Sequence, residues 1–435
     1  MFVNVTKVSR AATALCALAA ISACQDAVAP MPANAPPGDL PTLVASRENK
    51  VEREVVKDQY IVVFRDGFDD VDARSSKLMK GNKGRIKHAF RAGIKGFVGA
   101  MTAEEAAAMA SDPSVRYVEQ DQVVTLGVGR PTEGSKPGGK RGGKVAEPAD
   151  PEPLPGTVVQ TPVPSWGLDR LDQESNFFDN KYTYTATGST VHAYIIDSGI
   201  RTTHAEFEGR ATADVDFIND GYGATGCNWH GTHVAGTVGG KTAGVAKNVR
   251  LHSVRVLDCN AAGEVSGAVA GIDWVIANRV SPAIINLSIQ TGGIGVLTDA
   301  VERAVAAGIT VVVAAGNSGV DACNYSPSNA PNAITVGSLS MEDGLNVFSN
   351  YGSCVDIAAP GQYIGSVSNV DDVSFQYGTG TSMAAPHVAG AAALYLERDP
   401  VALPATVASA ILAKAMVGVM QNLPAGTANL VLRTF

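Results

Sequence analysis

The C-terminal two thirds of the chain alternate hydrophobic runs rich in β-branched residues with stretches of helical periodicity. Five runs are predicted strands, at residues 191–196, 249–256, 283–289, 309–315 and 333–336. Five stretches are predicted helices, at residues 230–238, 264–278, 296–307, 382–396 and 404–415. Strands that are hydrophobic without polar alternation are buried on both faces, as in a parallel sheet between layers of helices. The pattern predicts a three-layer α/β domain over residues 161–435, with a mainly parallel sheet and ligands beyond the carboxyl ends of its strands.

The pattern over residues 57–126 predicts a second, smaller α+β domain. Residues 58–64 and 115–119 are predicted strands, and a helix is expected to open near Thr102, with Glu105 placed for a capping box. A domain of about seventy residues buries a thin core. We therefore expect it to be marginally stable alone and to need a partner surface.

The segments that flank the smaller domain lack periodicity. Residues 24–56 are rich in Pro, Ala and Asn and are predicted to form a disordered tether. Residues 127–160 carry many Pro and Gly residues, with Lys136, Lys140, Arg141 and Lys144 among them. A solvated linker, open to proteolysis, is favoured there over a nucleic-acid-binding arm.

The N-terminus, residues 1–23, has the order of an export signal. Lys7 and Arg10 precede a short apolar run, and residues 21–24, Ile-Ser-Ala-Cys, are similar to a bacterial lipobox. Cys24 would then be lipidated and would anchor a precursor in the cell envelope; an ordinary cut after Ala29 is the alternative. No later segment is long and apolar enough to span a bilayer. We expect an exported protein that reaches a membrane only through lipid on Cys24.

Composition narrows the function classes. Hydrophobic residues fill 45% of the 435 positions and charged residues 17%, and the formal net charge is −8. An acidic chain without a basic patch gives no reason to expect nucleic acid as a partner. We expect an acidic globular protein, monomeric, with a well-buried interior.

Four cysteines remain outside the export signal. They are Cys227, Cys259, Cys323 and Cys354. An even set in an exported protein predicts disulfides, whereas a zinc site is the alternative and no C-x-x-C pair supports it. The residues themselves leave three pairings open.

Residues 380–390, a glycine turn followed by small residues, place Ser382 at the predicted start of a helix. Free N–H groups and the positive end of the helix dipole stabilise developing negative charge at such a position. Ser382 is therefore a candidate nucleophile for attack on a carbonyl. The alternative is an ordinary N-cap, the commonest use of a serine before a helix.

Other polar residues lie where predicted elements begin or end. Asp197 follows a strand and is either a turn former or a carboxylate held at the ligand end of the sheet. His230 and His233 open a helix; they could ligate a metal, but no third ligand completes a zinc motif, so a general base is favoured. Asn317 follows another strand and is either a loop residue or an oxyanion donor. With Ser382, every part of an acyl-transfer site has a candidate.

The motifs around these residues resemble those of the subtilases, the subtilisin-type serine proteases, and most of all the proteinase K and aqualysin branch. Residues 196–199 (Ile-Asp-Ser-Gly), 230–236 (His-Gly-Thr-His-Val-Ala-Gly) and 380–384 (Gly-Thr-Ser-Met-Ala) carry the likeness, in the order Asp, His, Ser. The resemblance covers residues 161–435 and implies a subtilisin-like fold. Residues 57–126 are similar to the inhibitor-type propeptide of the same enzymes, which implies a zymogen.

The resemblance also implies roles for the candidate residues. Ser382 would be the nucleophile, His230 the general base and acid, Asp197 the residue that orients the imidazole, and Asn317 an oxyanion-hole donor. The implied activity is that of a secreted serine endopeptidase, which hydrolyses proteins and peptides through an acyl-enzyme without an organic cofactor. The propeptide would assist folding, inhibit the enzyme, and be removed by self-cleavage near residues 150–165.

Disulfides and calcium are implied in the same way. The family's cysteine spacing favours the pairs Cys227–Cys259 and Cys323–Cys354. Two structural Ca²⁺ sites are implied, because hard oxygen ligands suit this ion. The first comprises Asp169, Asp172, Gln173 and Asp179; unligated, these would form an ordinary solvated helix start. The second comprises the carbonyls of Pro331 and Ala333 with the carboxylate of Asp356.

Three positions depart from the family pattern. Beside the primary pocket, the usual Ser-Leu-Gly-Gly is replaced by Ser288, Ile289, Gln290 and Thr291. Trp229 precedes the base, and Ala385 replaces a usual Thr or Ser. The first two put the family's preference for large apolar residues before the cleaved bond in doubt. His233 and His387 are expected to be structural.

The same residues disfavour two other functions. A silent binding protein on the same fold would need a disabled catalytic group, and all four are intact. An esterase of the nucleophile-elbow type is disfavoured, because residues 380–384 lack the second glycine of that motif and the acid and base precede the serine.

Overall fold

The computed structural model describes residues 54–67, 70–80, 84–126, 156–293 and 295–434. The export signal, Cys24, most of the predicted tether and residues 127–155 of the predicted linker lie outside these ranges. Within them, none of the helices combines the length and the hydropathy that a membrane crossing requires. We call residues 54–126 the N-terminal part and residues 156–434 the C-terminal part.

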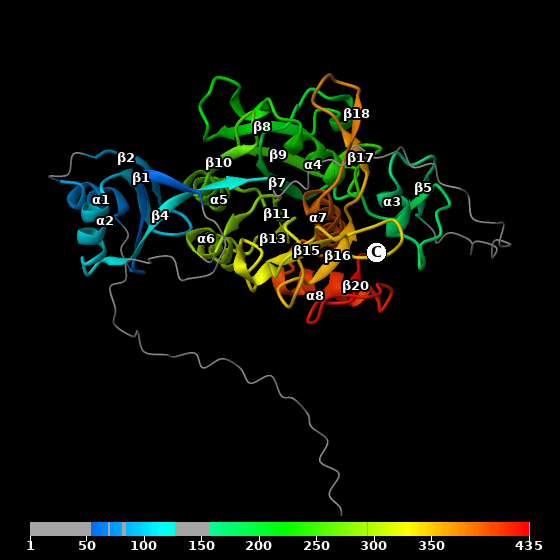
Figure 1. The fold of residues 1–435 in the computed structure, drawn as a ribbon. Coiled ribbons are helices and arrows are strands. Elements are labelled where there is room, and N and C mark those ends of the chain that lie inside the picture. The colour runs from blue at the N-terminus through cyan, green and yellow to red at the C-terminus, as the bar shows by residue number, and fades with distance from the viewer. Residues whose placement is uncertain (1–53, 68–69, 81–83, 127–155, 294, 435) are drawn as a thin grey trace, which may run out of the picture. The chain divides into compact units, whose positions relative to one another are not determined.

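The C-terminal part is built on a nine-stranded sheet (Figure 1). Its strand order is β19-β20-β16-β15-β13-β11-β7-β9-β8, and every pair except β19 with β20 is parallel. The strands are β7 (His192–Asp197), β8 (Ala211–Asp216), β9 (Arg250–Arg255), β11 (Ala283–Leu287), β13 (Thr310–Ala314), β15 (Ile334–Leu339), β16 (Ile357–Pro360), β19 (Met416–Val417) and β20 (Leu430–Val431). The mainly parallel sheet expected from the hydrophobic runs is confirmed.

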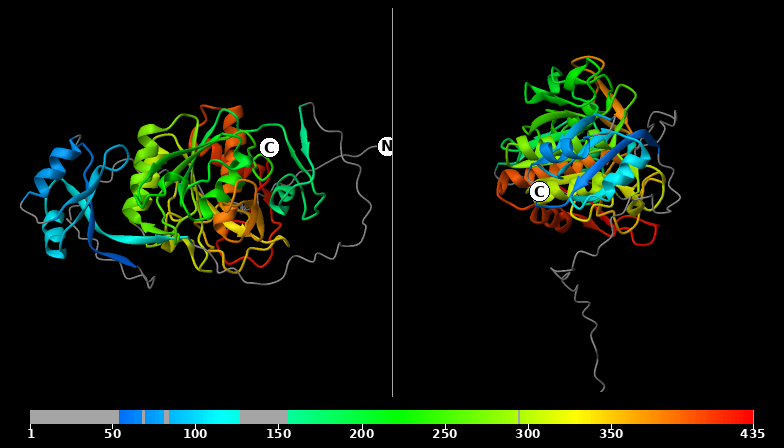
Figure 2. Two further views of the ribbon diagram at one scale, coloured as in Figure 1. Left: turned by 90° about the horizontal axis from the view of Figure 1, so that it is seen from above. Right: turned by 90° about the vertical axis from the view of Figure 1, so that its left-hand side faces the viewer.

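Helices cover both faces of this sheet. One hydrophobic cluster joins it to α4 (His230–Gly239), α7 (Thr381–Arg398) and α8 (Pro404–Lys414). A second cluster joins its other face to α5 (Val265–Asn278) and α6 (Val296–Ala306). Figure 2 shows the two layers, yellow-green on one side of the sheet and orange to red on the other. The three-layer α/β architecture is therefore confirmed, with most boundaries within one or two residues of those expected.

Short elements complete the C-terminal part. They are α3 (Trp166–Leu171), the 3₁₀ turns Ala205–Phe207, Gly223–Thr225 and Ala322–Asn324, and the strand pairs β5 (Val158–Gln160) with β6 (Tyr182–Tyr184), β12 (Thr291–Gly292) with β14 (Tyr325–Ser326), and β17 (Ile364–Val367) with β18 (Phe375–Gly378). Strand β5 lies in the last residues of the predicted linker. Residues 158–160 are therefore a strand paired with β6 rather than part of a solvated linker.

The N-terminal part is a small antiparallel sheet with two helices. Its elements are β1 (Val55–Phe64), α1 (Val71–Leu78), β2 (Ile86–Phe90), β3 (Gly96–Ala100), α2 (Ala103–Ala110) and β4 (Val115–Thr125). The capping box is present, since Thr102 Oγ1 accepts from Glu105 N and Glu105 accepts from Thr102 N. The core is thin, centred on residues such as Val62, Phe97 and Val118.

Strand β4 is twice as long as expected and joins the two parts. Its end pairs antiparallel with β10 (Ala262–Glu264), with Thr125 opposite Ala262. The polar residues Glu119, Asp121 and Gln122 hid this extension from the hydrophobic pattern, yet all three are buried. Their burial depends on partners from the C-terminal part, which agrees with the expected need for a partner surface.

Those partners are backbone N–H groups at the starts of two helices. A carboxylate oxygen of Glu119 accepts from Val296 N at 2.9 Å, at the start of α6. Asp121 Oδ1 accepts from Ser266 N at 3.0 Å, at the start of α5. Such positions stabilise negative charge, because the first N–H groups of a helix have no intrahelical acceptor.

Candidate active site

Asp197 and His230 form a hydrogen-bonded pair inside the C-terminal part. Asp197 is the last residue of β7 and His230 the first of α4, and neither is exposed to solvent. His230 Nδ1 lies 2.9 Å from both carboxylate oxygens of Asp197. His230 Nε2 is buried and has no hydrogen-bond partner in the described part of the chain. The imidazole is thus held at one nitrogen and free to exchange a proton at the other.

Glycines allow the two elements to approach this closely. A Cβ added to Gly231 would lie 2.4 Å from the Gly199 carbonyl oxygen and 3.2 Å from Asp197 Cβ. Gly199 has φ +101°, a conformation that favours glycine. Asn228 Oδ1 accepts from His230 N at 3.0 Å and so satisfies a free N–H at the start of α4. Steric crowding between the two elements therefore explains why these motif positions are glycine.

Ser382 lies in the first turn of α7 and is almost fully buried, with 1% of its surface exposed. The N-cap of α7 is Gly380, so the reading of Ser382 as an ordinary N-cap is wrong. Ser382 Oγ donates to the Ser288 carbonyl oxygen at 3.3 Å. The hydroxyl is therefore turned toward Ser288, the residue that follows β11.

Asn317 presents an unused amide donor beside the serine. Its Oδ1 accepts from Thr381 N at 2.8 Å and from Thr381 Oγ1 at 3.1 Å, which fixes the orientation of the carboxamide. Asn317 Nδ2 is buried and has no partner among the described residues. A Cβ on Gly380 would lie 3.3 Å from Nδ2, so glycine keeps the space in front of the donor open.

These residues come together because their elements are neighbours. Strands β7, β11 and β13 are adjacent and parallel, so the residues after them share one edge of the sheet. Helices α4 and α7 pack against each other and begin at that edge. A carboxylate–imidazole pair, a serine hydroxyl at a helix start and an oriented amide N–H are the parts needed for acyl transfer to a serine.

The other two histidines of these helices bind backbone carbonyls. His233 Nε2 lies 3.0 Å from the Ile364 oxygen, and His387 Nδ1 lies 2.8 Å from the Met383 oxygen. Burial lowers the pKa of His233 to about 3 and that of His387 to about 4, because a charged imidazole would lose its hydration. Both rings are neutral and fully enclosed, as a structural role requires.

The end of β4 lies between β10 and Gln290, two residues after Ser288. Thr125 N donates to the Gln290 oxygen at 3.3 Å, and Gln290 N donates to the Thr125 oxygen at 3.2 Å. Strand β10 flanks β4 on its other side, where Leu126 N donates to the Ala261 oxygen at 3.4 Å. An extended peptide can therefore bind between β10 and Gln290 by backbone hydrogen bonds alone.

Comparison with known proteins identifies the family. Residues 188–433 match the profile of the subtilase family, and residues 59–127 match that of the peptidase inhibitor I9 family. The chain belongs to the subtilase family. It is a serine peptidase with an I9-type propeptide.

Relatives of the same kind match most of this subtilase. It is 41% identical to the extracellular serine proteinase of Thermus sp. (strain Rt41A), over 88% of this chain and 90% of that one. It is 39% identical to alkaline serine exoprotease A of Vibrio alginolyticus, over 83% of this chain and 65% of that one. A crystal structure of a cold-adapted subtilisin-like serine proteinase, 42% identical, aligns with a TM-score of 0.60 over 62% of this chain and 98% of that one.

The residues of the first acidic set of this subtilase are linked by hydrogen bonds. Gln173 Nε2 donates to Asp179 Oδ1 at 3.1 Å and lies 3.5 Å from Asp172 Oδ1, while Asp169 accepts from the backbone of residues 179 and 180. Burial, together with repulsion from neighbouring carboxylates, raises the pKa of Asp169 to about 7 and that of Asp172 to about 6. A nearby cation would relieve both effects.

The fit to an ion is incomplete in two respects. The carboxylate oxygens of the acidic set do not all lie within 4.8 Å of one another. Lys181 Nζ lies 3.2 Å from Asp179 Oδ2 and already supplies one positive charge. In the second expected set, Asp356 Oδ2 accepts from Thr335 N at 2.7 Å, and burial raises the pKa of this carboxyl.

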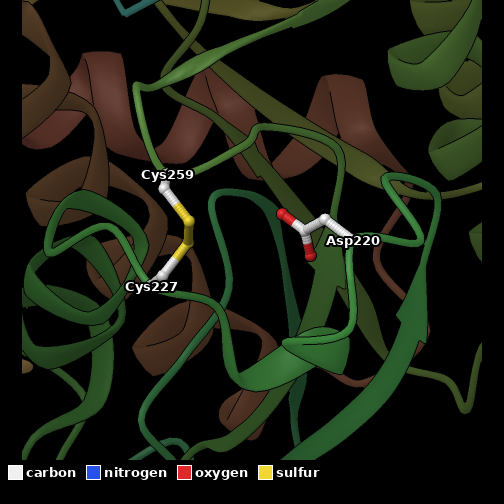
Figure 3. Close-up of side chains that lie close together, drawn as sticks. All are labelled: Asp220, Cys227 and Cys259. Atoms are coloured by element: carbon white, nitrogen blue, oxygen red, sulfur yellow. A yellow bond between two sulfur atoms is a disulfide. The ribbon is translucent and has the colours of Figure 1, made fainter.

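Both disulfides have the pairings implied by the family. Cys227 is bonded to Cys259 and Cys323 to Cys354, with Cα atoms 5.0 and 5.3 Å apart. Figure 3 shows the first bridge with Asp220 near it. Asp220 binds Arg255, and the two sulfurs are joined to each other, so this group offers no thiolates to a metal.

Sequence reasoning missed β10 and the contacts that prepare the oxyanion donor. Strand β10 has three residues, two of them Ala and Gly, and follows a cysteine loop, so no hydrophobic run marks it. Thr381 holds Asn317 in place, and only its position one residue before Ser382 could have suggested this.

Proposed function

We propose that this subtilase is a secreted serine endopeptidase in which Asp197, His230 and Ser382 act as the catalytic triad and Asn317 as an oxyanion-hole donor. The assignment rests on the buried Asp197–His230 pair. Its Nε2 atom has no hydrogen-bond partner among the described residues, and the pair lies at the sheet edge that also carries Ser382 and Asn317. Both Nε2 of His230 and Nδ2 of Asn317 are unpartnered among the described residues. In this proposal, they are the two atoms that a reacting peptide uses.

The reaction then proceeds in two halves. His230 Nε2 takes the proton from Ser382 Oγ as the oxygen attacks the peptide carbonyl carbon, and Asp197 stabilises the imidazolium through Nδ1–H. The oxyanion accepts hydrogen bonds from Asn317 Nδ2 and from the Ser382 N–H at the start of α7. The imidazolium gives its proton to the leaving amine, and water attacks the acyl-enzyme by the same route in reverse.

We also propose that the N-terminal part acts as chaperone and inhibitor of the same chain. The end of its strand β4 lies between β10 and Gln290, where a substrate would bind. In the antiparallel register of Thr125 with Gln290, a bound peptide residue two positions further along would lie opposite Ser288. Because Ser288 O contacts Ser382 Oγ, the first self-cleavage is expected after Gly127.

Removal of the remaining linker is proposed to follow, near residues 150–165. Since β5 pairs with β6, a final cut before Val158 would leave that strand pair intact. The domain division proposed is signal 1–23, tether 24–56, propeptide 57–126, linker 127–160 and peptidase 161–435. Export is supported by a relative that is named an extracellular serine proteinase. If Cys24 carries lipid, self-cleavage would free a soluble enzyme from an anchored precursor.

Structural calcium is a further part of the proposal. Asp169, Asp172, Gln173 and Asp179 would hold one ion, and the Pro331 and Ala333 carbonyls with Asp356 a second. The raised pKa values of Asp169 and Asp172 support the first site. Calcium would stabilise the fold there and supply no step of the chemistry.

The proposal is tested by expressing the full chain with Ser382→Ala. We expect the precursor to stay uncut and casein hydrolysis to vanish, while circular dichroism remains that of the folded chain. Secretion of wild type and N-terminal sequencing of each fragment would locate the cuts. A Ser382→Ala precursor that still processes itself in purified form would overturn the assignment of the nucleophile.

The lipid is tested separately. Metabolic labelling with a fatty acid should mark wild-type precursor, and Cys24→Ser should abolish the label. A Cys24→Ser chain that carries the same label would refute lipidation at this residue.

A further inference from the structure

The side chain of Gln290 lies between the substrate-binding strand and the loop that carries the oxyanion donor. A Cβ added to Gly316, one residue before Asn317, would lie 2.0 Å from Gln290 Oε1 and 3.0 Å from Gln290 Cδ. The Gln290 carboxamide therefore rests on the Gly316 Cα. Its Oε1 is buried and has no hydrogen-bond partner among the described residues. An unsatisfied buried acceptor is costly, so its position calls for an explanation.

The register of β4 shows which substrate residue faces this carboxamide. Thr125 and Gln290 form an antiparallel pair, and cross-strand partners direct their side chains to the same face. Side chains two residues apart on a strand also share a face. The residue that supplies the cleaved carbonyl, which we call P1, pairs with Ser288, so its side chain emerges on the face that Gln290 occupies.

The P1 side chain must therefore share the space between residues 288–290 and Gly316 with the Gln290 side chain. The Asn350 carboxamide also lies at this place: its Nδ2 would be 2.4 Å from a Cβ on Gly316, and it donates to the Ala315 oxygen at 2.9 Å. Two carboxamides therefore lie against the Gly316 Cα, and that of Gln290 projects from the segment that binds the substrate backbone. We expect them to leave little room for a large side chain.

We propose that Gln290 fills the primary specificity pocket and restricts this enzyme to peptide bonds that follow small residues, such as Gly, Ala and Ser. The inference rests on the proposed peptidase function. The sequence of the chain agrees with it, since Gly127, after which we propose the first self-cleavage, has no side chain.

The test uses matured enzyme and tetrapeptide p-nitroanilides that differ only at P1, with Ala, Leu or Phe. Wild type should cleave the Ala substrate at least about tenfold faster, in kcat/KM, than the Phe substrate. Gln290→Gly should empty the pocket and raise the Phe-to-Ala ratio by about 100-fold or more. Gln290→Ala should give an intermediate ratio, whereas Gln421→Gly, an exposed glutamine far along the chain, should leave it unchanged.

The outcomes separate the two levels of the proposal. A folded, fully matured wild type that cleaves none of the peptides would sink the peptidase assignment itself. A wild type that cleaves all of them but prefers Phe or Leu over Ala would overturn only the role of Gln290, as would a ratio that Gln290→Gly leaves unchanged. Should Gln290→Gly fail to mature, Gln290→Ala and the wild-type profile decide the question by the same criteria.

Discussion

Two acidic sites in the C-terminal part differ in what neutralises them. The single carboxylate of Asp197 is fully buried and faces the imidazole of His230, and it also accepts from Ser198 N at 2.7 Å. The other site comprises Asp169, which is buried, with Asp172 and Asp179, which are half-buried, and burial and repulsion raise the pKa of Asp169 to about 7. Lys181 pairs with Asp179 in this second site, where we propose an added cation. We therefore expect the first to govern catalysis and the second to govern stability.

The largest expected effect is on kcat, and it distinguishes the two acidic sites. Asp197→Asn should lower kcat by about 10⁴-fold, because an amide favours the wrong tautomer of His230. The isosteric control Asp169→Asn should leave kcat of folded, matured enzyme within about twofold. Steady-state kinetics on active-site-titrated protein measures both. Equal losses in the two variants would break the comparison.

A smaller loss of kcat is expected when the proposed oxyanion donor is removed. This prediction tests the catalytic site further. Asn317→Leu removes the unpartnered Nδ2 and should lower kcat by about 10²–10³-fold with KM little changed, a magnitude taken from the equivalent loss in subtilisin. Thr381→Ser, which keeps the hydroxyl that contacts Asn317 Oδ1, is the matched control. An unchanged kcat in Asn317→Leu would show that this amide does not meet the oxyanion.

On the stability side, removal of calcium should act through the second acidic site. Chelation should lower the stability of the Ser382→Ala protein by roughly 3–4 kcal/mol if calcium had been present at 100 to 1,000 times its Kd. Asp169→Asn should abolish most of the difference between melting curves with calcium and with chelator. A wild-type melting temperature that is the same with calcium and with chelator would contradict the calcium proposal.

Acid should destabilise the fold through the two structural histidines. The pKa of His387 is lowered to about 4 and that of His233 to about 3, while unfolded histidines titrate near about 6.5. Because the folded values are depressed, the stability they contribute is complete above pH 6.5 and is lost as pH falls toward 4. One histidine shifted by more than two units accounts for roughly 3 kcal/mol by pH 4.

Urea unfolding of Ser382→Ala at pH 7, 5.5 and 4 measures this loss. His387→Gln should be less stable at pH 7 but should show a shallower dependence on pH. The expectation fails if the wild-type and His387→Gln curves have the same pH slope.

The smallest effect concerns a buried carboxylate of β4 that accepts a hydrogen bond from the C-terminal part. Asp121→Asn in the isolated propeptide should weaken its inhibition of matured enzyme by about tenfold, because a charge-assisted bond to Ser266 N becomes a neutral one. Asp72→Asn, on an exposed helix of the same part, serves as the control. Identical inhibition constants for the two variants would count against the contact seen at β4.

The sequence predicted the five adjacent central strands β15, β13, β11, β7 and β9, because their runs are largely hydrophobic. It missed β8, which carries polar residues, and the short strands β16, β19 and β20. It also predicted the four catalytic candidates, since glycine-rich motifs mark the places where backbones approach closely, as at Gly231 and Gly380. What it could not predict depends on contacts between distant segments. The predicted strand stopped at Glu119, yet β4 continues to Thr125 and its Glu119 and Asp121 accept from backbone N–H groups at helix starts of the other part. The direction of the Gln290 side chain likewise follows only from its contact with Gly316.

The most direct test of the central claim is active-site labelling of the matured enzyme with a fluorophosphonate, followed by peptide mapping. The account predicts stoichiometric modification of Ser382 alone, with labelling slowed by several orders of magnitude in His230→Ala. Modification of a different serine, or full-rate labelling without His230, would contradict it.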